Sequence, residues 1–238
     1  GELCCGTCYC PAGGRVKESE EKARELVKNL GGFSPKRVIL LCTGCYRQFT
    51  ELYPKFLELD FEVQHYTRFL GENLFRVDLA QLPGRIIVHA SCMPRRTRAY
   101  EWARELLQRI PGLEVVKEEA LCCGGVANMA YPEMGQRLGS ALAEAIAGAE
   151  ADYAVSVCPF CSLTLHAHLR KNASRLKGIA SLMNRAARGE EYPNRLAEYW
   201  GCESLGEVMD KSREYLEASG LSTQETRQLL AAVFGALG

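Results

Sequence analysis

The sequence contains the same series of motifs twice, and this duplication restricts the possible fold more than any other feature. Residues 3–10, LCCGTCYC, are followed by a helical stretch, the apolar run RVILLC at 37–42 and a Cys-x-x-Cys motif. Residues 121–128, LCCGGVAN, are followed in the same order by a helical stretch, the run YAVSVC at 153–158 and a second Cys-x-x-Cys motif. A period of this length indicates two copies of one domain rather than a solenoid of short repeats.

The cysteines keep nearly the same spacing in both copies. The offset is 118 residues for the vicinal pair and 116 residues for the Cys-x-x-Cys motif, so that Cys4 and Cys5 correspond to Cys122 and Cys123, and Cys42 and Cys45 correspond to Cys158 and Cys161. Cys92 precedes the vicinal pair of the second copy, and its counterpart would fall upstream of Gly1. We therefore expect the first copy to lack its opening strand and its first cysteine.

Short apolar runs rich in β-forming residues alternate with helical stretches along both copies. The runs lie at 37–42, 61–66, 85–92, 113–117 and 153–158. This alternation predicts βαβ units and an α/β fold, with parallel sheets flanked by helices. Ligand sites of such sheets lie beyond the carboxyl ends of the strands. Cys42, Cys92 and Cys158 each stand at that end of an apolar run.

The cysteine pattern stops after about residue 180, and three helical stretches follow near 193–200, 204–219 and 222–237. The sequence STQE predicts a capping box, in which Ser222 and Glu225 bind each other's backbone. Behind it, one apolar face is predicted to pack on the helix's own domain; it consists of Leu229, Leu230, Val233, Phe234 and Leu237.

Charge and cysteine usage exclude several classes of protein. The 29 basic and 29 acidic side chains balance, so the chain has no broad electrostatic footprint for nucleic acid. No apolar run approaches the length of a membrane span, and no signal peptide is visible. The 12 cysteines cluster in vicinal and Cys-x-x-Cys pairs, which indicates metal or redox chemistry in a reducing cytoplasm, as in an anaerobe.

The stretches VHASC, LCCGG and VCPFC together resemble the CCG, or cysteine-rich, domain. That domain occurs in the B and D subunits of heterodisulfide reductase and in related iron–sulfur oxidoreductases. The resemblance implies two similar α/β domains that face each other, with cofactors near their interface. It places an N-terminally incomplete first CCG domain at 1–80, a complete second CCG domain at 81–185 and a C-terminal helical extension at 186–238.

The resemblance also implies a noncubane [4Fe-4S] cluster held by the five cysteines of the second copy: Cys92, Cys122, Cys123, Cys158 and Cys161. The chemistry of the residues agrees with this expectation. Thiolates select iron–sulfur clusters, zinc or copper(I). Adjacent cysteines point in different directions, which suits a cluster with separate irons, and a glycine after them lets backbone N–H groups approach sulfide. A Cys-x-x-Cys at a helix start favours thiolate.

The first copy offers four thiolates for a metal: Cys4, Cys5, Cys42 and Cys45. Four thiolates would satisfy zinc, whereas a second [4Fe-4S] cluster would need a further ligand. That ligand could be Cys8 or Cys10, or it could come with a strand from a missing or separate chain. In the alternative interpretation, Cys8 and Cys10 are two extra thiols that bind nothing.

Three groups near the cysteines have a functional and a structural interpretation. His89 could donate an N–H to cluster sulfide or to substrate as a catalytic residue, or could be a satisfied group at a strand end. Arg95, with Arg96 and Arg98, could hold an anionic thiol substrate, or could form a solvated helix start. His166 and His168 lie two residues apart on a helix and are not expected to be ligands.

We therefore expect an iron–sulfur oxidoreductase subunit of the heterodisulfide reductase B/D type, which exchanges electrons with a small thiol or disulfide substrate. The sequence has no ferredoxin, flavin or nucleotide fingerprint, so we expect ferredoxin-like or flavoprotein partner subunits in a hetero-oligomer. One alternative is a non-catalytic relay or scaffold subunit of a flavin-linked complex. Another is a thioredoxin-like dithiol protein, since the stretch CPFC follows a strand.

Overall fold

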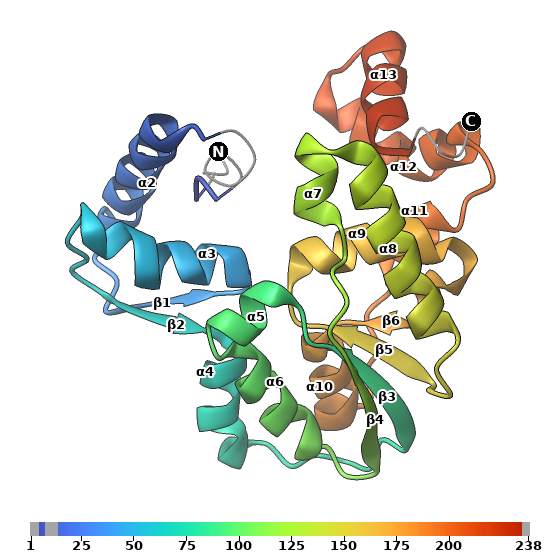
Figure 1. The fold of residues 1–238 in the computed structure, drawn as a ribbon, viewed down its shortest axis with the longest axis horizontal. Helices are drawn as coiled ribbons and strands as arrows, with labels where there is room; N and C mark the ends of the chain where they lie inside the picture. The colour runs from blue at the N-terminus through green and yellow to red at the C-terminus, as the bar shows by residue number, and fades with distance from the viewer. Residues whose placement is uncertain (1–4, 8–13, 235–238) are drawn as a thin grey trace.

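The computed structural model describes residues 5–7 and 14–234 and contains two parallel sheets flanked by helices (Figure 1). The first sheet pairs β1 with β2, and the second has the strand order β4-β3-β5-β6. The predicted α/β class is therefore confirmed. Of the described residues, none form a helix that is both long enough and apolar enough to cross a bilayer.

The first half consists of a two-stranded sheet with helices around it. Its elements are α2 (Val16–Gly31), β1 (Arg37–Leu40), α3 (Thr43–Arg47), a π-helical turn (Gln48–Leu52), a 3-10 turn (Tyr53–Lys55), β2 (Glu62–His65), α4 (Tyr66–Asn73) and a 3-10 turn (Leu74–Arg76). Ala23 of α2 is buried with Phe49 and Tyr53, and the rings of these two are 4.6 Å apart. This small core covers only one face of the sheet, the face of Leu40.

The second half has a larger sheet with helices on both faces. Its elements are β3 (Gly84–His89), α5 (Cys92–Arg96), α6 (Ala99–Gln108), β4 (Leu113–Glu119), α7 (Gly125–Ala130), α8 (Pro132–Ala147), β5 (Tyr153–Ser156), α9 (Pro159–Leu169), a 3-10 turn (Arg170–Arg175), β6 (Leu176–Lys177) and α10 (Ile179–Arg188). The five runs predicted as strands are all strands. The sequence missed β6, because two residues are too few to show a period of two.

Successive side chains of the central strands point to opposite faces and build two cores. On one face Ile86, Val88 and Val155 pack with α6 and α10. On the other face Ile87 and Ala154 pack with α8 and α9. Both cores are needed because β3 and β5 are the inner strands, and a parallel strand inside a sheet must be covered on both faces.

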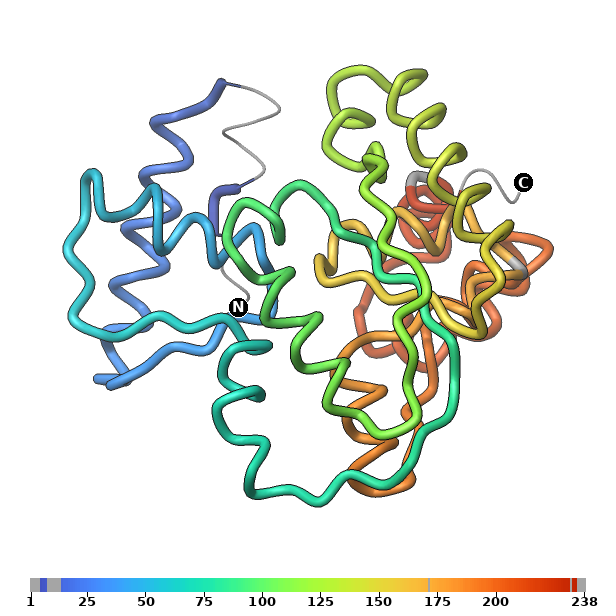
Figure 2. Tube along the Cα trace, turned by 60° about the horizontal axis from the view of Figure 1, so that its bottom comes forward, coloured from blue at the N-terminus to red at the C-terminus, as the bar shows by residue number. Residues whose placement is uncertain are grey.

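The two halves meet at the carboxyl ends of their strands and along one helix. The connection after α4 crosses to the second half along one side of the molecule (Figure 2). Tyr66 and Leu70 of α4 pack against the core under α6. The buried hydroxyl of Thr43 donates to the carbonyl of Val157 at 3.5 Å, so the two Cys-x-x-Cys segments touch.

Three helices complete the described chain: α11 (Arg195–Trp200), α12 (Leu205–Ser219) and α13 (Thr223–Phe234). The predicted capping box is present, since the Ser222 N–H donates to the Glu225 carboxylate at 2.9 Å and the Glu225 N–H donates to Ser222 Oγ at 3.3 Å.

The predicted apolar face of α13 is only partly correct. Phe234 stacks against Trp200 with ring centroids 4.6 Å apart, and Leu230 packs beside it. Leu229 and Val233, however, stay exposed, because α13 meets the rest of the extension along a narrower stripe than the sequence pattern indicated. Leu237 lies outside the described residues.

Candidate metal centre

The five cysteines of the second copy lie beyond the carboxyl ends of three neighbouring parallel strands. Cys92 follows β3, Cys122 and Cys123 follow β4, and Cys158 and Cys161 follow β5. Strand β3 pairs in parallel with both β4 and β5, so all three strands end at one edge of the sheet. The fold thereby brings together cysteines that lie up to 69 positions apart in the sequence.

The loop after β4 depends on its glycines. Gly124 has φ +75°, and a Cβ there would lie 2.1 Å from the carbonyl oxygen of Gly135. A side chain at Gly125 would collide with the hydroxyl of Thr164. The tight turn directs two backbone N–H groups toward sulfur atoms. The Gly124 N–H donates to Cys122 Sγ at 3.4 Å, and the Gly125 N–H donates to Cys123 Sγ at 3.5 Å.

Helix α9 holds the other pair of thiols at its positive end. Cys158 is the N-cap, Pro159 occupies the first turn and Cys161 follows in that turn. The helix dipole and free N–H groups stabilise negative charge there. The sulfur atoms of Cys123 and Cys161 lie 3.2 Å apart, and all three of these cysteines are buried.

Hydrogen bonds among these three sulfurs shift their pKa values in opposite directions. The hydrogen bond with Cys161 lowers the pKa of Cys123 to about 6, despite the opposing effect of burial. The same partner lowers the pKa of Cys158, whereas hydrogen bonds to Cys123 and Cys158 raise the pKa of Cys161. Thiolate, the form that binds metal, is therefore favoured on two of the three sulfurs.

Cys92 and Cys122 form the open side of this group, since both are exposed. Partial burial raises the pKa of Cys92, and the charges of Cys122, Cys123 and Cys158 raise it further. Cys92 thus lies within electrostatic range of three of its four predicted companions. A molecule from solvent can approach the site from this side.

Two buried polar atoms beside the cysteines have no hydrogen-bond partner among the described residues. They are Ser91 Oγ and His89 Nδ1. His89 and Ser91 are in phase with Ile87 along the chain, so their side chains lie on the side of β3 that packs toward α8 and α9. A buried hydroxyl without a partner is costly, so an acceptor such as sulfide beside Cys92 would satisfy it. The site therefore fits a bound iron–sulfur group on an observation independent of the thiols.

His89 hydrogen-bonds through Nε2, which lies 2.9 Å from the carbonyl oxygen of Leu121. Burial lowers the pKa of His89, so the ring is neutral and Nε2 carries its proton. His89 thus donates this proton to the backbone carbonyl of Leu121, the residue directly before Cys122. Sequence reasoning considered His89 as a donor to sulfide or substrate, but the observed contact gives it a positioning role in the loop after β4.

The first copy repeats this arrangement. Cys42 is the N-cap of α3 and Cys45 lies in its first turn. The sulfur atoms of Cys45 and Cys5 lie 3.0 Å apart. Hydrogen bonds to Cys45 lower the pKa of Cys5 and of Cys42 to about 6, and the same bonds raise the pKa of Cys45. Gly6, with φ +77°, matches Gly124 of the second copy.

Three predicted ligands of the first site, Cys4, Cys8 and Cys10, lie outside the described residues. Among the residues that are described, no three His, Cys, Asp or Glu side chains gather closely enough for a single metal ion. A tetrahedral zinc site needs sulfurs about 3.8 Å apart, given a Zn–S distance of about 2.3 Å. The sulfur atoms of Cys5 and Cys45, 3.0 Å apart, already lie within that separation.

The arginines after Cys92 differ in their surroundings. Arg96 binds Glu51 of the first half at 3.1 Å, and Arg47 binds the same carboxylate. Arg98 adopts a left-handed conformation, with φ 62°, at the start of α6. Arg95 is exposed and contacts no charged or polar group of the described chain. The guanidinium groups of Arg95 and Arg98 are both exposed, and Arg95 lies nearer to Cys92 in the sequence.

The two histidines of α9 contact neighbouring segments of the second half and of the extension. The ring nitrogens of His166 bind the carbonyl of Ser162 at 2.7 Å and the side chain of Asn194 at 3.1 Å. His168 lies against Gly139, where any larger side chain would clash, and 3.4 Å from the Ser140 hydroxyl. Both histidines hold helices together.

Sequence reasoning missed three residues at the centre. Ser91 could have been noticed as the neighbour of a predicted ligand. Thr43 and Tyr66 had no such signal, because their importance depends on how the two halves meet. The charge of Cys42 acts on Cys158, and the charge of Cys158 acts on Tyr66, whose pKa is raised chiefly by burial. The two cysteine groups therefore face each other.

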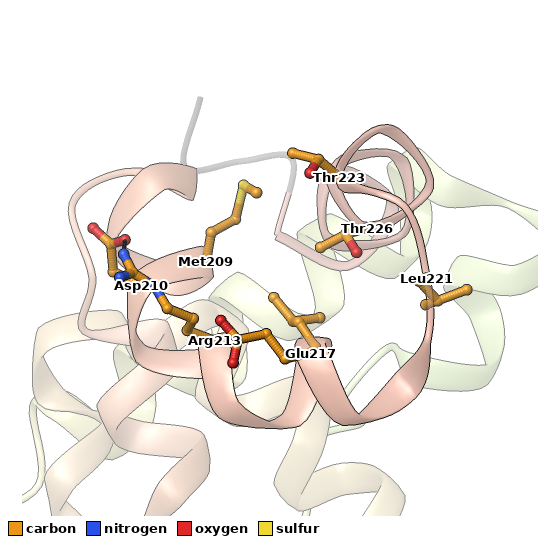
Figure 3. A pocket seen from close by; sticks show the side chains of 8 residues that line it. Met209, Asp210, Arg213, Glu217, Leu221, Thr223 and Thr226 are labelled. Carbon is orange, nitrogen blue, oxygen red and sulfur yellow. Dashed lines mark hydrogen bonds and ion pairs between the residues drawn. The ribbon is translucent and has the colours of Figure 1, made fainter.

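The groove between α12 and α13 of the C-terminal extension contains none of this chemistry within the described chain. Figure 3 shows the groove of about 440 Å³ between α12 and α13, lined by Met209, Asp210, Arg213 and Thr226 among others. Of the described residues that line it, none is a cysteine or a histidine. Its polar groups are also partly paired, since Arg213 binds Asp210. We assign no function to this groove.

Comparison with known proteins identifies a known domain in the chain and several relatives. Residues 86–166 match the cysteine-rich domain named CCG. The chain is 31% identical over 179 residues to the iron–sulfur protein MJ0092 of Methanocaldococcus jannaschii, covering 74% of this chain and 35% of that protein. It is 31% identical over 180 residues to the D subunit of dihydromethanophenazine:CoB–CoM heterodisulfide reductase of Methanosarcina barkeri. This match covers 69% of this chain and 44% of that subunit.

A third relative, the B subunit of the fumarate reductase (CoM/CoB) of Methanothermobacter marburgensis, is 28% identical over 176 residues, covering 72% of this chain and 35% of that protein. The chain thus matches less than half the length of each of these relatives. Residues 86–166 thus carry the CCG cysteine-rich domain, and the relatives of the chain include the D subunit of a heterodisulfide reductase and other iron–sulfur proteins. The predicted family is confirmed.

Proposed function

We propose that this chain is the CCG module of an iron–sulfur oxidoreductase of the heterodisulfide reductase B/D type. In this proposal a noncubane [4Fe-4S] cluster binds Cys92, Cys122, Cys123, Cys158 and Cys161. One observation carries it: three adjacent parallel strands deliver all five thiols to one edge of a sheet. When bound, the cluster would supply one-electron chemistry toward a disulfide or thiol substrate.

The protein's own residues have distinct roles in this proposal. Buried Cys123, Cys158 and Cys161 would anchor the group, while exposed Cys92 and Cys122 would leave one side accessible. The N–H groups of the glycines after Cys123 and the unpaired Ser91 hydroxyl would donate hydrogen bonds to sulfur, which stabilises the reduced, more negative state. His89 would hold the loop before Cys122 in place.

Arg95 would attract the substrate. Its guanidinium is exposed three residues after Cys92 and has no partner among the described groups. Thiol substrates with a carboxylate, sulfonate or phosphate would bind it through bidentate hydrogen bonds. In this proposal Arg95 orients substrate beside the exposed thiols and takes no part in electron transfer.

For the first site we propose a second metal group at Cys4, Cys5, Cys42 and Cys45. The paired pKa pattern supports metal binding, because two of its three described thiols favour the thiolate. Zinc would be satisfied by these four, while a second [4Fe-4S] cluster would require a further ligand, for which Cys8 and Cys10 are candidates. Metal content decides between the two.

The accessibility of the second site favours catalysis over the alternative of electron relay. A relay centre functions best when buried, whereas Cys92 and Cys122 are exposed. The thioredoxin-like alternative is disfavoured, because the dithiol of Cys158 and Cys161 is buried and a third sulfur, that of Cys123, lies 3.2 Å from Cys161. A dithiol that exchanges with substrate has to be reached by it.

The proposed organisation is a first CCG domain at 1–80, a second at 81–185 and a helical extension at 186–238. Ferredoxin-like or flavoprotein subunits would deliver electrons, and a small thiol or disulfide would be the substrate. A reducing cytoplasm would suit the free thiols of the described chain. These partners follow from the redox chemistry that the cysteine site supports.

Anaerobic iron, sulfide and zinc analysis, combined with electron paramagnetic resonance, tests the proposal. We expect about four irons per chain from the second site alone and about eight if both sites hold clusters. Arg95→Gln should raise KM for an anionic substrate and leave the iron content and the resonance spectrum unchanged. An iron-free protein after anaerobic purification would refute the proposed function.

A further inference from the structure

A cavity of about 630 Å³ lies between the second half and the C-terminal extension. Helices α7, α8 and α9 form one side of it, and Trp200 of α11 and Val233 of α13 line it from the extension (Figure 1). A cavity of this volume is within the range of sites for small organic ligands. None of the described residues that line it is a cysteine, and none is shared with the groove of Figure 3.

The inner wall of the cavity is tightly packed, because glycines let three helices approach one another closely. A Cβ at Gly139 would lie 2.2 Å from His168 Nε2, and a Cβ at Gly135 would lie 2.4 Å from the Cα of Asn128. These contacts fix α8 against α7 and α9, and such close packing leaves a wall little room to relax. The cavity is therefore a preformed feature of this wall and of the extension that closes over it.

Three of the side chains that line the cavity are large, apolar and exposed. Met129 of α7 is 50% exposed, Leu163 of α9 is 40% exposed and Val233 of α13 is 55% exposed. They belong to three separate helices and yet meet around one cavity. Exposed apolar side chains that gather in a concave site indicate that an apolar group binds there. The exposure of Val233, which the packing of α13 left unexplained, thereby has a reason.

The polar side chains of the cavity can all donate hydrogen bonds. They include the amides of Asn128 and Gln136, the hydroxyl groups of Ser140 and Thr164, and the guanidinium of Arg170. Of the described residues that line the cavity, none is an aspartate or a glutamate. A ligand with a negatively charged group would thus meet donors and a positive charge without repulsion from a carboxylate.

Trp200 points to a ligand independently of the cavity's size. Its side chain lines the cavity and is 5% exposed, and its indole N–H has no hydrogen-bond acceptor among the described residues. A buried donor without an acceptor costs free energy, so native proteins seldom leave one unpaired. An acceptor atom of a ligand in this cavity would satisfy the indole N–H.

We propose that this cavity binds a small organic anion with an apolar body. The apolar body would lie against Met129, Leu163 and Val233, and a carboxylate or sulfonate would lie toward Arg170. The indole N–H of Trp200 would donate to the same ligand. The site is separate from the one proposed for Cys92 and its companion cysteines, and it requires neither a metal nor electron transfer.

Fluorescence titration under anaerobic conditions tests the proposal with two probes that share the same rings. Anilinonaphthalene sulfonate carries a negative charge, and we expect one molecule per chain to bind with a Kd on the order of 10 μM. Phenylnaphthylamine lacks the sulfonate and should bind at least about 10-fold more weakly. Equal affinity for the two probes would overturn the proposal, as would the absence of binding.

A matched pair of variants on α13 locates the bound probe. Val233→Trp should lower the affinity for anilinonaphthalene sulfonate at least about 10-fold, because the larger side chain would occupy the cavity. Leu229→Trp should leave the affinity within about twofold, since Leu229 is exposed to a similar extent, 56%, but is not among the described residues that line the cavity. Equal effects of the two variants would place the probe elsewhere and overturn the proposal.

The thermal midpoint separates a blocked site from a damaged fold. Both tryptophan variants replace an exposed side chain, so the midpoint should stay within about 1 °C of that of the parent chain. Val233→Trp that loses the probe at an unchanged midpoint supports the proposal. If the apparent affinity instead falls as protein concentration rises, a second copy of the chain covers the exposed apolar side chains and the proposal fails.

Arg170→Gln tests the charged end of the site. The change should weaken anilinonaphthalene sulfonate about 10-fold and leave phenylnaphthylamine within about twofold, because only the first probe carries a charge for the guanidinium. An equal loss for both probes, or a loss for neither, would contradict the proposed orientation of the ligand. These titrations do not require iron, so the proposed function and this inference can fail separately.

Discussion

The two halves of this protein hold their cysteines in the same way on unequal sheets. Sulfur atoms pair at 3.0 Å between Cys5 and Cys45 and at 3.2 Å between Cys123 and Cys161. In the described chain, the sheet beneath the first group has two strands, and the sheet beneath the second has four. The local motif of vicinal cysteines, glycine and Cys-x-x-Cys therefore builds the thiol geometry, whatever the size of the sheet.

What the larger sheet adds is burial. The described thiols of the first site are partly exposed, whereas Cys123, Cys158 and Cys161 are buried. Burial excludes water from the anchoring thiolates and strengthens their hydrogen bonds to backbone N–H groups. Under the proposed function, equal motifs would thus hold different groups: a protected cluster in the second half and a more exposed metal in the first.

Loss of metal is the largest effect that this comparison predicts. Cys123→Ser should reduce iron by about four per chain, because it removes an anchoring ligand of the second site. Cys5→Ser, the matching change, should remove only the metal of the first site. Cys202→Ser is the control, since that buried thiol donates to the carbonyl of Glu198, away from both sites. Metal analysis that shows the same losses in both site variants would contradict independent sites.

Side-chain truncation at matched positions of the two sheets should lower the free energy of unfolding by different amounts. Val157→Ala should lower the free energy of unfolding by about 2 kcal/mol, because the Val157 side chain is fully buried and its truncation leaves a cavity in the core. Leu41→Ala removes more carbon but should cost less than about 0.5 kcal/mol in residues 1–238, where the side chain faces solvent. Urea unfolding measures both, and an equal cost would mean that Leu41 is already covered.

The pH dependence of the first half should follow His65. Burial lowers the pKa of His65 to about 4, below its value of about 6.5 in an unfolded chain. Protons therefore bind the unfolded state first as pH falls, so the stability contributed by neutral His65 is complete above about pH 6.5 and is lost toward pH 4. The loss should reach about 3 kcal/mol.

Urea unfolding between pH 7 and pH 4 measures this slope, and His65→Gln is the variant that should flatten it. His168→Gln is the matched comparison: burial lowers the pKa of His168 as well, but this side chain is only half-buried, so the change should flatten the slope less. A slope that persists in His65→Gln would assign the acid sensitivity to other groups.

The contact between the halves should give the smallest effect. Thr43→Val keeps the shape of the side chain but removes the hydrogen bond to Val157, and should cost about 1 kcal/mol or less. Thr50→Val removes a comparable bond to Tyr46 within the first half. The two variants are compared by thermal unfolding followed through the fluorescence of Trp102, whose ring is 6.0 Å from that of Tyr46 across the junction. Only Thr43→Val should loosen the junction without altering either half.

Local chemistry determined much of this protein from the sequence. The apolar runs became β1 to β5, and Cys42 and Cys158 became the N-caps of α3 and α9, because strand and helix starts follow from short-range patterns. The capping box of α13 formed as its spacing predicted. The repeat matched Cys5 to Cys123 and Cys45 to Cys161, and the sulfur atoms of each copy lie together in the same way, since duplicated sequences fold alike.

Only the tertiary structure decided what depends on distant contacts. The strand order β4-β3-β5 gathers cysteines from three loops, and no periodicity encodes which strands become neighbours. The commitment of the His89 proton to Leu121, the unpaired hydroxyl of Ser91 and the contact of Thr43 with Val157 arise where separate segments of the described chain meet. The exposed face of α13 was missed for the same reason, because a helix pattern shows which residues are apolar but not how much partner surface lies opposite them.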